Sequence, residues 1–305
     1  MPSRLEQHPG LLLHDITRLF RHSFGTQLRD LGLSEPQWRV LGTVNRLSGM
    51  DQTQLAALLG IGKAPLGKLV DRLESEGLLQ RYPDPDDRRT NRLRLTPRAQ
   101  PITDTMRRRH LQFQEYYLAE LDLPTRQVLE ETLLTVYTNL AGDNQDRQIL
   151  PSTESLSIIQ LISAVTRLNS RHFDIKLKAM GFTRSQWLVL SALDADEGLS
   201  QSSLAAKLNM GKAPLGVLID ELEAGDWLLR QIDPQDRRAR RLFLTPACRA
   251  DLQSMAQEFE TLHQYSLSHI GNTKQRLFTR ALQNIRARLN AYAEDPEQLF
   301  PEIKT

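Results

Sequence analysis

A mainly α-helical fold with small β-hairpins, built twice along one chain, is predicted by three features of this 305-residue sequence. The string GKAPLG occurs at 62–67 and again, unchanged, at 211–216. Apolar residues recur at helical spacing through much of both halves. Each half also contains a short arginine-rich stretch in which leucines alternate with other residues, as in a half-buried strand.

The duplication covers both halves of the chain. When the sequence is shifted by 149 positions, 22 of the 36 residues in Gly62–Pro97 are identical to those in Gly211–Pro246. A period this long indicates a duplicated domain and not a solenoid repeat. The polar segment GDNQDRQILPSTES (142–155) reads as a linker. We therefore predict one domain at 1–141, the linker at 142–155 and a second domain at 156–305.

Composition and charge limit the classes of function. The chain is 40% hydrophobic and 25% charged, and no apolar run approaches the ~20 residues that span a bilayer. The start, MPSRLEQHPG, lacks the apolar core of a signal peptide, so we expect a cytoplasmic protein. The net charge is only +2, so a surface that binds a polyanion must be local.

The same signals mark helix starts and ends in both halves. Long helices are predicted at 8–30 and 156–179, and each is followed by a glycine where a helix can stop. A capping residue then opens a second helix, and a short third helix ends at glycine or asparagine. These punctuating residues are Gly32, Ser34 and Gly60 in the first half, and Gly181, Thr183 and Asn209 in the second.

The repeated string opens the fourth helix of each half. Its apolar positions, spaced i, i+3, i+4 and i+7, form a stripe that faces a core. They are Leu66, Leu69, Val70 and Leu73, and Leu215, Leu218, Ile219 and Leu222. The other face is small or charged, and Pro65 stands early, where a helix tolerates it. A phosphate-binding P-loop is excluded, because Ala57 and Ala64 occupy positions that such a loop gives to glycine and to serine or threonine.

An arginine-rich hairpin is predicted after this helix. Leu93 and Leu95 alternate with arginines, and the stretch DPDD at 84–87 has turn chemistry. By itself the charge run fits a solvated edge strand. However, two helices joined by a tight turn and followed by a basic hairpin form a winged helix-turn-helix. In that motif the second helix enters the DNA major groove, and hairpin arginines reach phosphates or the minor groove.

This order of motifs resembles the MarR/SlyA family of bacterial transcription regulators. The resemblance rests on QLAA at 54–57, LVDRLESEGLL at 69–79, DPDDRR at 84–89 and LRLTP at 93–97, and it covers nearly the whole chain, twice. Family members form homodimers through their first and last helices. The chain looks like such a dimer fused head to tail, that is, a monomeric pseudo-dimer of two winged helix-turn-helix domains.

The resemblance implies a DNA-binding repressor of a pseudo-palindromic promoter site, with recognition helices about one turn, ~34 Å, apart. Its partner would be double-stranded DNA. The DNA-binding residues that it implies are Lys63, Ala64, Pro65, Gly67, Lys68, Arg72, Arg88, Arg89, Arg92, Lys212, Ala213, Pro214, Gly216, Arg237, Arg238 and Arg240. Asp87 and Asp236 would hold the wings by pairing with neighbouring arginines.

The recognition helices depart from the family pattern. Family members usually start this helix with serine, threonine and bulkier polar residues, whereas GKAPLG offers few donors to base edges. In the second half Val217 replaces Lys68 and Glu221 replaces Arg72, which predicts unequal affinity for two half-sites. The weak polarity favours an alternative, a ligand-binding or protein-interaction module that has lost DNA binding. Retention of both arginine wings favours DNA binding.

The resemblance also implies a small aromatic or phenolic effector that relieves DNA binding. Its candidate lining residues are Arg21, His22, Phe24, Trp38, Arg171, His172, Phe173 and Trp187. Each aromatic residue alone fits an ordinary core equally well. Cys248 is the single cysteine, and both a structural and a reactive role stay open. No metal-ligand spacing, nucleophile motif or glycine-rich phosphate loop occurs, so we expect no cofactor, no metal and no enzyme activity.

Overall fold

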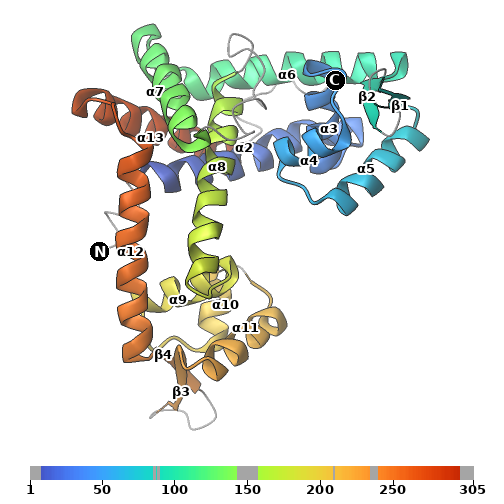
Figure 1. Ribbon diagram of the computed structural model, residues 1–305. Coiled ribbons are helices and arrows are strands. Elements are labelled where there is room, and N and C mark those ends of the chain that lie inside the picture. Colours follow the sequence, from blue (N-terminus) through green and yellow to red (C-terminus); the bar gives the residue numbers. More distant parts are fainter. Residues whose placement is uncertain are drawn as a thin grey trace. The chain divides into compact units, whose positions relative to one another are not determined.

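The computed structural model of the chain describes residues 8–84, 87, 90–142, 157–208, 210–233 and 240–295. It is mainly helical with two small antiparallel hairpins (Figure 1), which confirms the predicted fold class. The first repeat comprises α2 (Pro9–Gln27), η1 (Arg29–Leu31), α3 (Glu35–Arg46), α4 (Gln52–Leu59), α5 (Lys63–Ser75), β1 (Leu79–Pro83), β2 (Asn91–Leu95), η2 (Pro97–Ala99), α6 (Gln100–Leu118) and α7 (Leu123–Ala141).

The second repeat has the same order of helices and strands. It comprises α8 (Ile158–Ala179), α9 (Arg184–Ala195), α10 (Gln201–Leu208), α11 (Lys212–Ala224), β3 (Leu228–Ile232), β4 (Arg240–Leu244), α12 (Pro246–Ser266) and α13 (Asn272–Glu294). Within the described part of the chain, no helix is both long enough and apolar enough to cross a membrane.

Helix boundaries follow the predicted capping residues. The Gln37 side chain accepts a hydrogen bond from the Ser34 amide, and the Gln186 side chain accepts one from the Thr183 amide, each at 2.9 Å. Gly60 ends α4 with a φ of 64°, a left-handed conformation that favours glycine. The first helix is shorter than predicted: α2 ends at Gln27, and a separate 3₁₀ turn fills the span up to Gly32. Asn209 lies outside the described residues.

The chain forms two compact units whose limits differ from those of the repeats. The larger unit holds the described residues within 8–167 and 269–295. The smaller unit holds the described residues within 168–268, that is, all but 209 and 234–239. The larger unit therefore contains all of the first repeat together with the start of α8 and the whole of α13. The domain limits 1–141 and 156–305 describe the duplication in sequence and stay a prediction.

Helix α13 of the second repeat packs against α2, α6 and α7 of the first. Its Tyr292 side chain is 3% exposed, and the ring lies 4.9 Å from that of Phe113 on α6, measured between centroids. Arg288 stacks over the Tyr116 ring at 4.1 Å. The core of the larger unit is thus built from helices of both repeats, as in a dimer whose subunits exchange their last helices.

A hydrogen bond between two equivalent threonines lies in the same unit. The Oγ1 atoms of Thr17 and Thr166, which are 149 residues apart, are separated by 3.1 Å, and both side chains are buried. One of the two hydroxyls donates to the other, whose own proton goes to the carbonyl four residues earlier in its helix, that of Leu13 for Thr17 or of Ile162 for Thr166. The first helices of the two repeats therefore contact each other at equivalent positions.

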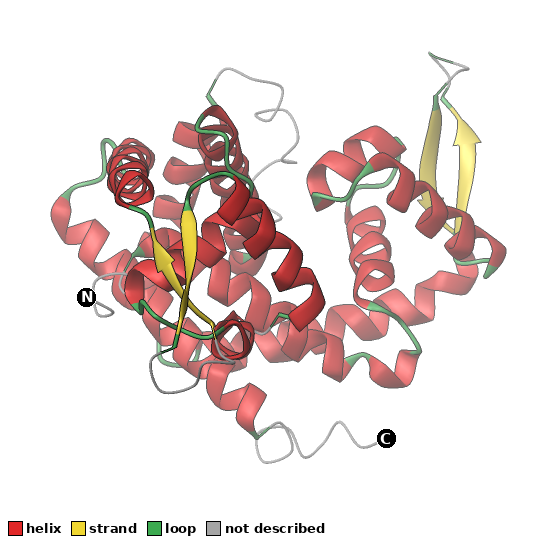
Figure 2. Cartoon of the chain, turned by 90° about the horizontal axis from the view of Figure 1, so that it is seen from below, coloured by secondary structure: helices red, strands yellow, loops and turns green. Residues whose placement is uncertain are grey.

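Each winged region has its own apolar core. The predicted stripe is confirmed, since Leu66, Val70 and Leu73 are fully buried and only Leu69 is partly exposed. The second core repeats this arrangement around α11. Each winged region with its core forms one lobe, and Figure 2 shows the two hairpins as yellow strands. In each lobe the antiparallel hairpin follows the fourth helix, and Leu79 pairs with Leu95 in the first wing.

Replacing Tyr292 by alanine should lower the free energy of unfolding of the larger unit by about 3–5 kcal/mol, because a large buried ring leaves a cavity between α13 and α6. Urea unfolding followed by circular dichroism measures this. The control is Tyr265→Ala, at a tyrosine that is 53% exposed, which should change stability by less than about 0.5 kcal/mol. Equal losses for the two variants would contradict the packing of α13 on the first repeat.

Candidate nucleic-acid interface

The two helices that begin with GKAPLG expose the same face. Each follows a glycine N-cap in extended conformation, Gly62 (φ −61°, ψ 150°) or Gly211 (φ −62°, ψ 143°). The predicted residues on these helices lie at the surface: the glycines are half-buried and the others are exposed. They are Lys63, Ala64, Pro65, Gly67, Lys68 and Arg72 on α5, and Lys212, Ala213, Pro214 and Gly216 on α11.

The lysines of this face carry unneutralised charge. Among the described residues, none forms an ion pair or a hydrogen bond with the side-chain ammonium of Lys63, Lys68 or Lys212. Arg72 differs, because its Nε donates to Glu76 at 2.9 Å, and Glu76 also accepts from the Gln37 amide. The face of α5 thus offers two free ammonium groups and one arginine that is already held.

Gly67 lies in the interior of α5, where glycine costs roughly 0.5–1 kcal/mol relative to alanine. A Cβ atom built at Gly67 would meet nothing within 4 Å. Packing inside the protein therefore does not require glycine there. A bare backbone at this half-buried surface position allows the close approach of an external partner.

An arginine on the first strand of each wing clamps the recognition helix. Arg81 on β1 pairs with Asp71 at 2.6 Å and with Glu74, both on α5. Arg230 on β3 makes the same two contacts, with Asp220 and Glu223 on α11. The arginine of each set is largely shielded from solvent, whereas its aspartate partner is exposed. Helix and hairpin are held together as one piece in each lobe.

A second ion pair fixes the base of each wing. In the first wing the Arg92 guanidinium donates to the buried Asp84 carboxylate at 2.6 Å and to the Gly49 carbonyl at 2.8 Å. Arg241 and Asp233 repeat the pair in the second wing at 2.7 Å. Arg92, which is in the predicted DNA-binding set, is therefore engaged inside its own lobe. Arg240, at the start of β4, is exposed.

Sequence reasoning missed Asp84 and Asp233 as wing-supporting residues. The available signal was an aspartate directly before the turn proline, eight residues before an arginine on the returning strand. Of the two aspartates that were predicted, Asp87 is exposed and accepts a hydrogen bond from the Thr90 hydroxyl at 2.9 Å. Its pairing with an arginine stays a prediction. Asp236 and the wing-tip arginines Arg88, Arg89, Arg237 and Arg238 lie outside the described residues.

The predicted phenylalanine and tryptophan of the effector site form one aromatic pair in each lobe. In the first lobe Phe24 and Trp38 are buried, and their rings meet edge to face at 5.2 Å. Arg21 lies 3.8 Å from Glu35, and His22 is exposed. The indole Nε1 of Trp38 is buried and has no hydrogen-bond partner among the described residues. This cluster is closed and forms part of the core.

The cluster of the second lobe is more open. Phe173 and Trp187 are half-buried, with ring centroids 6.1 Å apart. Two residues that sequence reasoning missed complete it: Phe259 stacks on Phe173 at 4.2 Å, and the Arg184 guanidinium lies over the same ring at 5.4 Å. Of the other predicted residues, Arg171 is exposed and His172 is half-buried.

The position equivalent to Phe259 in the first lobe is held by a histidine. His110 contacts Phe24 edge to face at 5.7 Å. Burial, and then the nearby charge of Arg46, lowers the pKa of His110 to about 4. His110 is therefore neutral at pH 7 and acts there as a polar ring within an aromatic cluster.

Cys248 is fully buried in the core of the second lobe. Burial, together with the charges of Asp251 and Asp194, raises the pKa of the Cys248 thiol to about 11. Reactive cysteines require a low pKa and access to solvent, so this environment favours the structural role.

In each half, a helix, a turn, an exposed second helix and an antiparallel hairpin stand in the order of a winged helix-turn-helix. The sequence model of the MarR family matches residues 33–90 and 182–239, which is this region of both repeats. The chain therefore carries two MarR family winged-helix regions in tandem.

Solved structures with similar folds match about half of the chain at a time. A mutant of S. aureus MepR is 21% identical over 44% of this chain and 99% of its own, with a TM-score of 0.42. A mutant of E. coli MarR is 21% identical, covering 43% of this chain and 96% of its own, with a TM-score of 0.39. Another S. aureus MepR mutant, solved bound to an oligodeoxyribonucleotide, is 21% identical over 44% of this chain and 99% of its own, with a TM-score of 0.37.

Proposed function

We propose that the chain is a DNA-binding transcription regulator that acts as a single-chain pseudo-dimer. It occupies a pseudo-palindromic promoter site and represses transcription by blocking access to the promoter. The observation that carries the proposal is the pair of GKAPLG helices, each with an exposed face bearing unpaired lysine and each clamped to a wing. Since its partner is chromosomal DNA, we place the protein in the cytoplasm.

The start of each recognition helix suits a DNA phosphate. The first amides of a helix lack intrahelical acceptors, and the helix dipole favours an anion there. Lys63 and Lys212 stand at the first helical position and add a full positive charge. The alanine and proline that follow carry no long side chain, so a phosphate or a base edge can come close to the backbone.

The wings would supply the second contact. Arg81 and Arg230 fix each hairpin to its recognition helix, so that the hairpin follows the helix when the helix enters a major groove. We assign the wing tips, with Arg88 and Arg89 or Arg237 and Arg238, to the minor groove or adjacent phosphates.

The two halves would bind with unequal strength. At the position of Arg72 the second helix has Glu221, which accepts a hydrogen bond from the Gln186 amide. A carboxylate facing the phosphate backbone opposes binding, so the first repeat should make the tighter half-site contact.

We further propose that a small aromatic or phenolic acid releases the DNA. The support is the half-buried cluster of Phe173, Trp187 and Phe259, which offers ring faces for stacking beside the cation of Arg184. The effector carboxylate would compete for this cation with Asp174, which pairs with Arg184 at 2.8 Å. The equivalent rings in the first lobe are closed into the core. The second lobe is therefore the preferred site of the effector.

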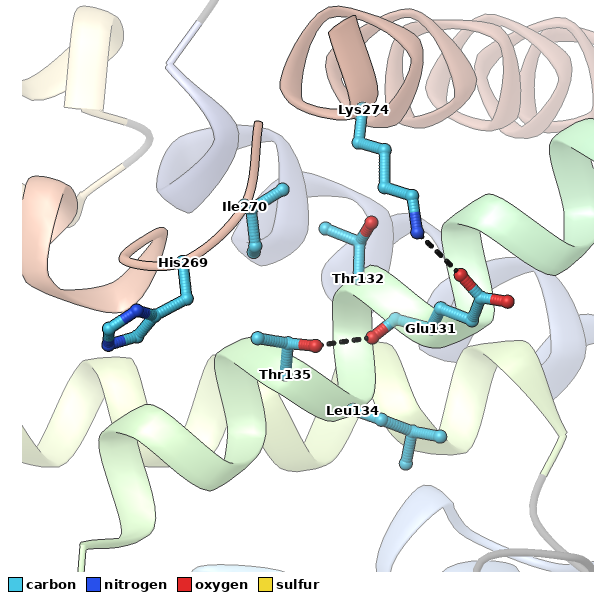
Figure 3. A pocket seen from close by; sticks show the side chains of 7 residues that line it. All are labelled: Glu131, Thr132, Leu134, Thr135, His269, Ile270 and Lys274. Carbon is cyan, nitrogen blue, oxygen red and sulfur yellow. Dashed lines mark hydrogen bonds and ion pairs between the residues drawn. The ribbon is translucent and has the colours of Figure 1, made fainter. Parts of the chain in front are cut away.

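Replacing Arg88 and Arg237 together by alanine should abolish specific DNA binding. Replacing Lys63 and Lys212 together by alanine should weaken DNA binding. If both lysines contact phosphate, the slope of log K against log salt concentration should fall by about 2. Gel-shift titrations against the DNA upstream of the chain's own coding sequence measure both effects. Lys274→Ala on α13 removes a positive charge elsewhere, at a lysine that pairs with Glu131 at 2.8 Å (Figure 3), and should leave affinity and slope unchanged. Unaltered binding by the arginine variant would contradict the wing assignment.

Salicylate should quench tryptophan fluorescence and release the DNA at the same concentrations, because Trp187 stacks in the effector cluster. Trp187→Phe should remove the fluorescence change, whereas Trp38→Phe should retain it, since Trp38 is enclosed in the first lobe. If Trp187→Phe keeps the fluorescence change seen with the wild type, the change does not come from Trp187. The effector then binds elsewhere or not at all.

A further inference from the structure

Positions 68 and 217 are the first at which the two recognition helices differ. Residues 62–67 are identical to 211–216, and the next residue is Lys68 in α5 but Val217 in α11. Both side chains are exposed, Val217 by 58%. In each half this residue lies one turn beyond the alanine of GKAPLG, on the same side of the helix.

The two helices present this position in the same way. Their N-cap glycines have nearly equal backbone angles, so both helices start in the same conformation. The side chains on the buried stripe are fully enclosed at equivalent positions, which fixes the rotation of each helix in its lobe. They are Leu66, Val70 and Leu73 in α5, and Leu215, Ile219 and Leu222 in α11.

The supports beside this position are also equivalent. Arg81 and Arg230 each hold the aspartate three residues further on, Asp71 or Asp220. Among the described residues, no carboxylate pairs with the Lys68 ammonium. The difference between the halves at this point therefore lies in the chemistry of the two side chains and not in their framework.

That chemistry distinguishes base pairs in the major groove. A lysine ammonium donates to the O6 and N7 acceptors of guanine. Valine has no donor, and its methyl groups make apolar contact with the C5 methyl group of thymine. We propose that the two half-sites differ at the base pair facing this position, with guanine opposite Lys68 and thymine opposite Val217. The inference rests on the proposed DNA-binding function and adds the identity of one base in each half-site.

The test is selection of duplexes from a random-sequence pool by the wild-type chain and by two exchange variants. The wild type should select a pseudo-palindrome with guanine in one half and thymine at the symmetry-related position. Lys68→Val should select thymine in both halves, and Val217→Lys should select guanine in both. In competition between duplexes that differ only there, each exchange should shift the preference at least about fivefold.

Ser75→Ala is the matched control. It also converts a residue of α5 to its counterpart in α11, Ala224, but at the far end of the helix, and should leave the selected sequence unchanged. Far-UV circular dichroism confirms that all variants are folded. Selection of no duplex by the wild type would refute the proposed function itself. A specific wild-type site that both exchange variants also select, with only the affinity changed (lower for Lys68→Val, higher for Val217→Lys), would leave DNA binding intact and overturn the base assignment, because this position would then contact phosphate.

Discussion

The packing of α13 against α2, α6 and α7 is the contact on which the larger unit depends. It brings a helix from the end of the chain into the core of the first repeat, where Tyr292 fills space beside Phe113. In the same unit Thr17 on α2 and Thr166 on α8, at equivalent positions near the start of the two repeats, form a hydrogen bond. In the larger unit, α13 of the second repeat thus covers apolar surface of the first repeat.

Each winged lobe depends on a smaller set of ionic contacts. The arginine of the first strand holds the recognition helix, and an aspartate–arginine pair closes the base of the hairpin. Both sets recur in both lobes with the same residue types, so they conserve the framework while the exposed surface differs. Lys68 against Val217 changes what the lobe presents to a partner without changing how the lobe is held. Arg72 against Glu221 also changes an internal contact, because Gln37 donates to Glu76 in the first lobe and Gln186 donates to Glu221 in the second. The aromatic clusters also combine a shared arrangement with a local difference. His110 in the first lobe stands at the position that Phe259 occupies in the second.

The periodicity and the capping residues predicted most of the fold. Ser34, Thr183 and Gly60 act locally, within a few residues of the chain, so their effects can be read without knowing the tertiary structure. The stripe at Leu66, Val70 and Leu73 was predictable for the same reason. The packing of α13 on the first repeat was expected only through resemblance to a dimer, because contacts between distant segments leave no local pattern.

The candidate site was predicted less completely. Exposure of the GKAPLG face followed from the stripe on its opposite side. The role of Arg92 did not, because an arginine on a strand looks the same in sequence whether it faces DNA or a buried carboxylate such as Asp84. Sequence reasoning did not find Phe259 and Arg184 in the effector cluster. Phe259 lies far from Phe173 and Trp187 in the sequence, and Arg184 has no aromatic ring.

In the proposed function, one chain supplies both DNA-binding halves. The mass of the complex with a selected duplex, measured by sedimentation velocity or native mass spectrometry, tests it most directly. We predict one 34.9 kDa chain per duplex that carries both half-sites, with no change when protein is in excess. Two chains bound to each such duplex, with single half-site duplexes binding one chain at equal affinity, would contradict the account.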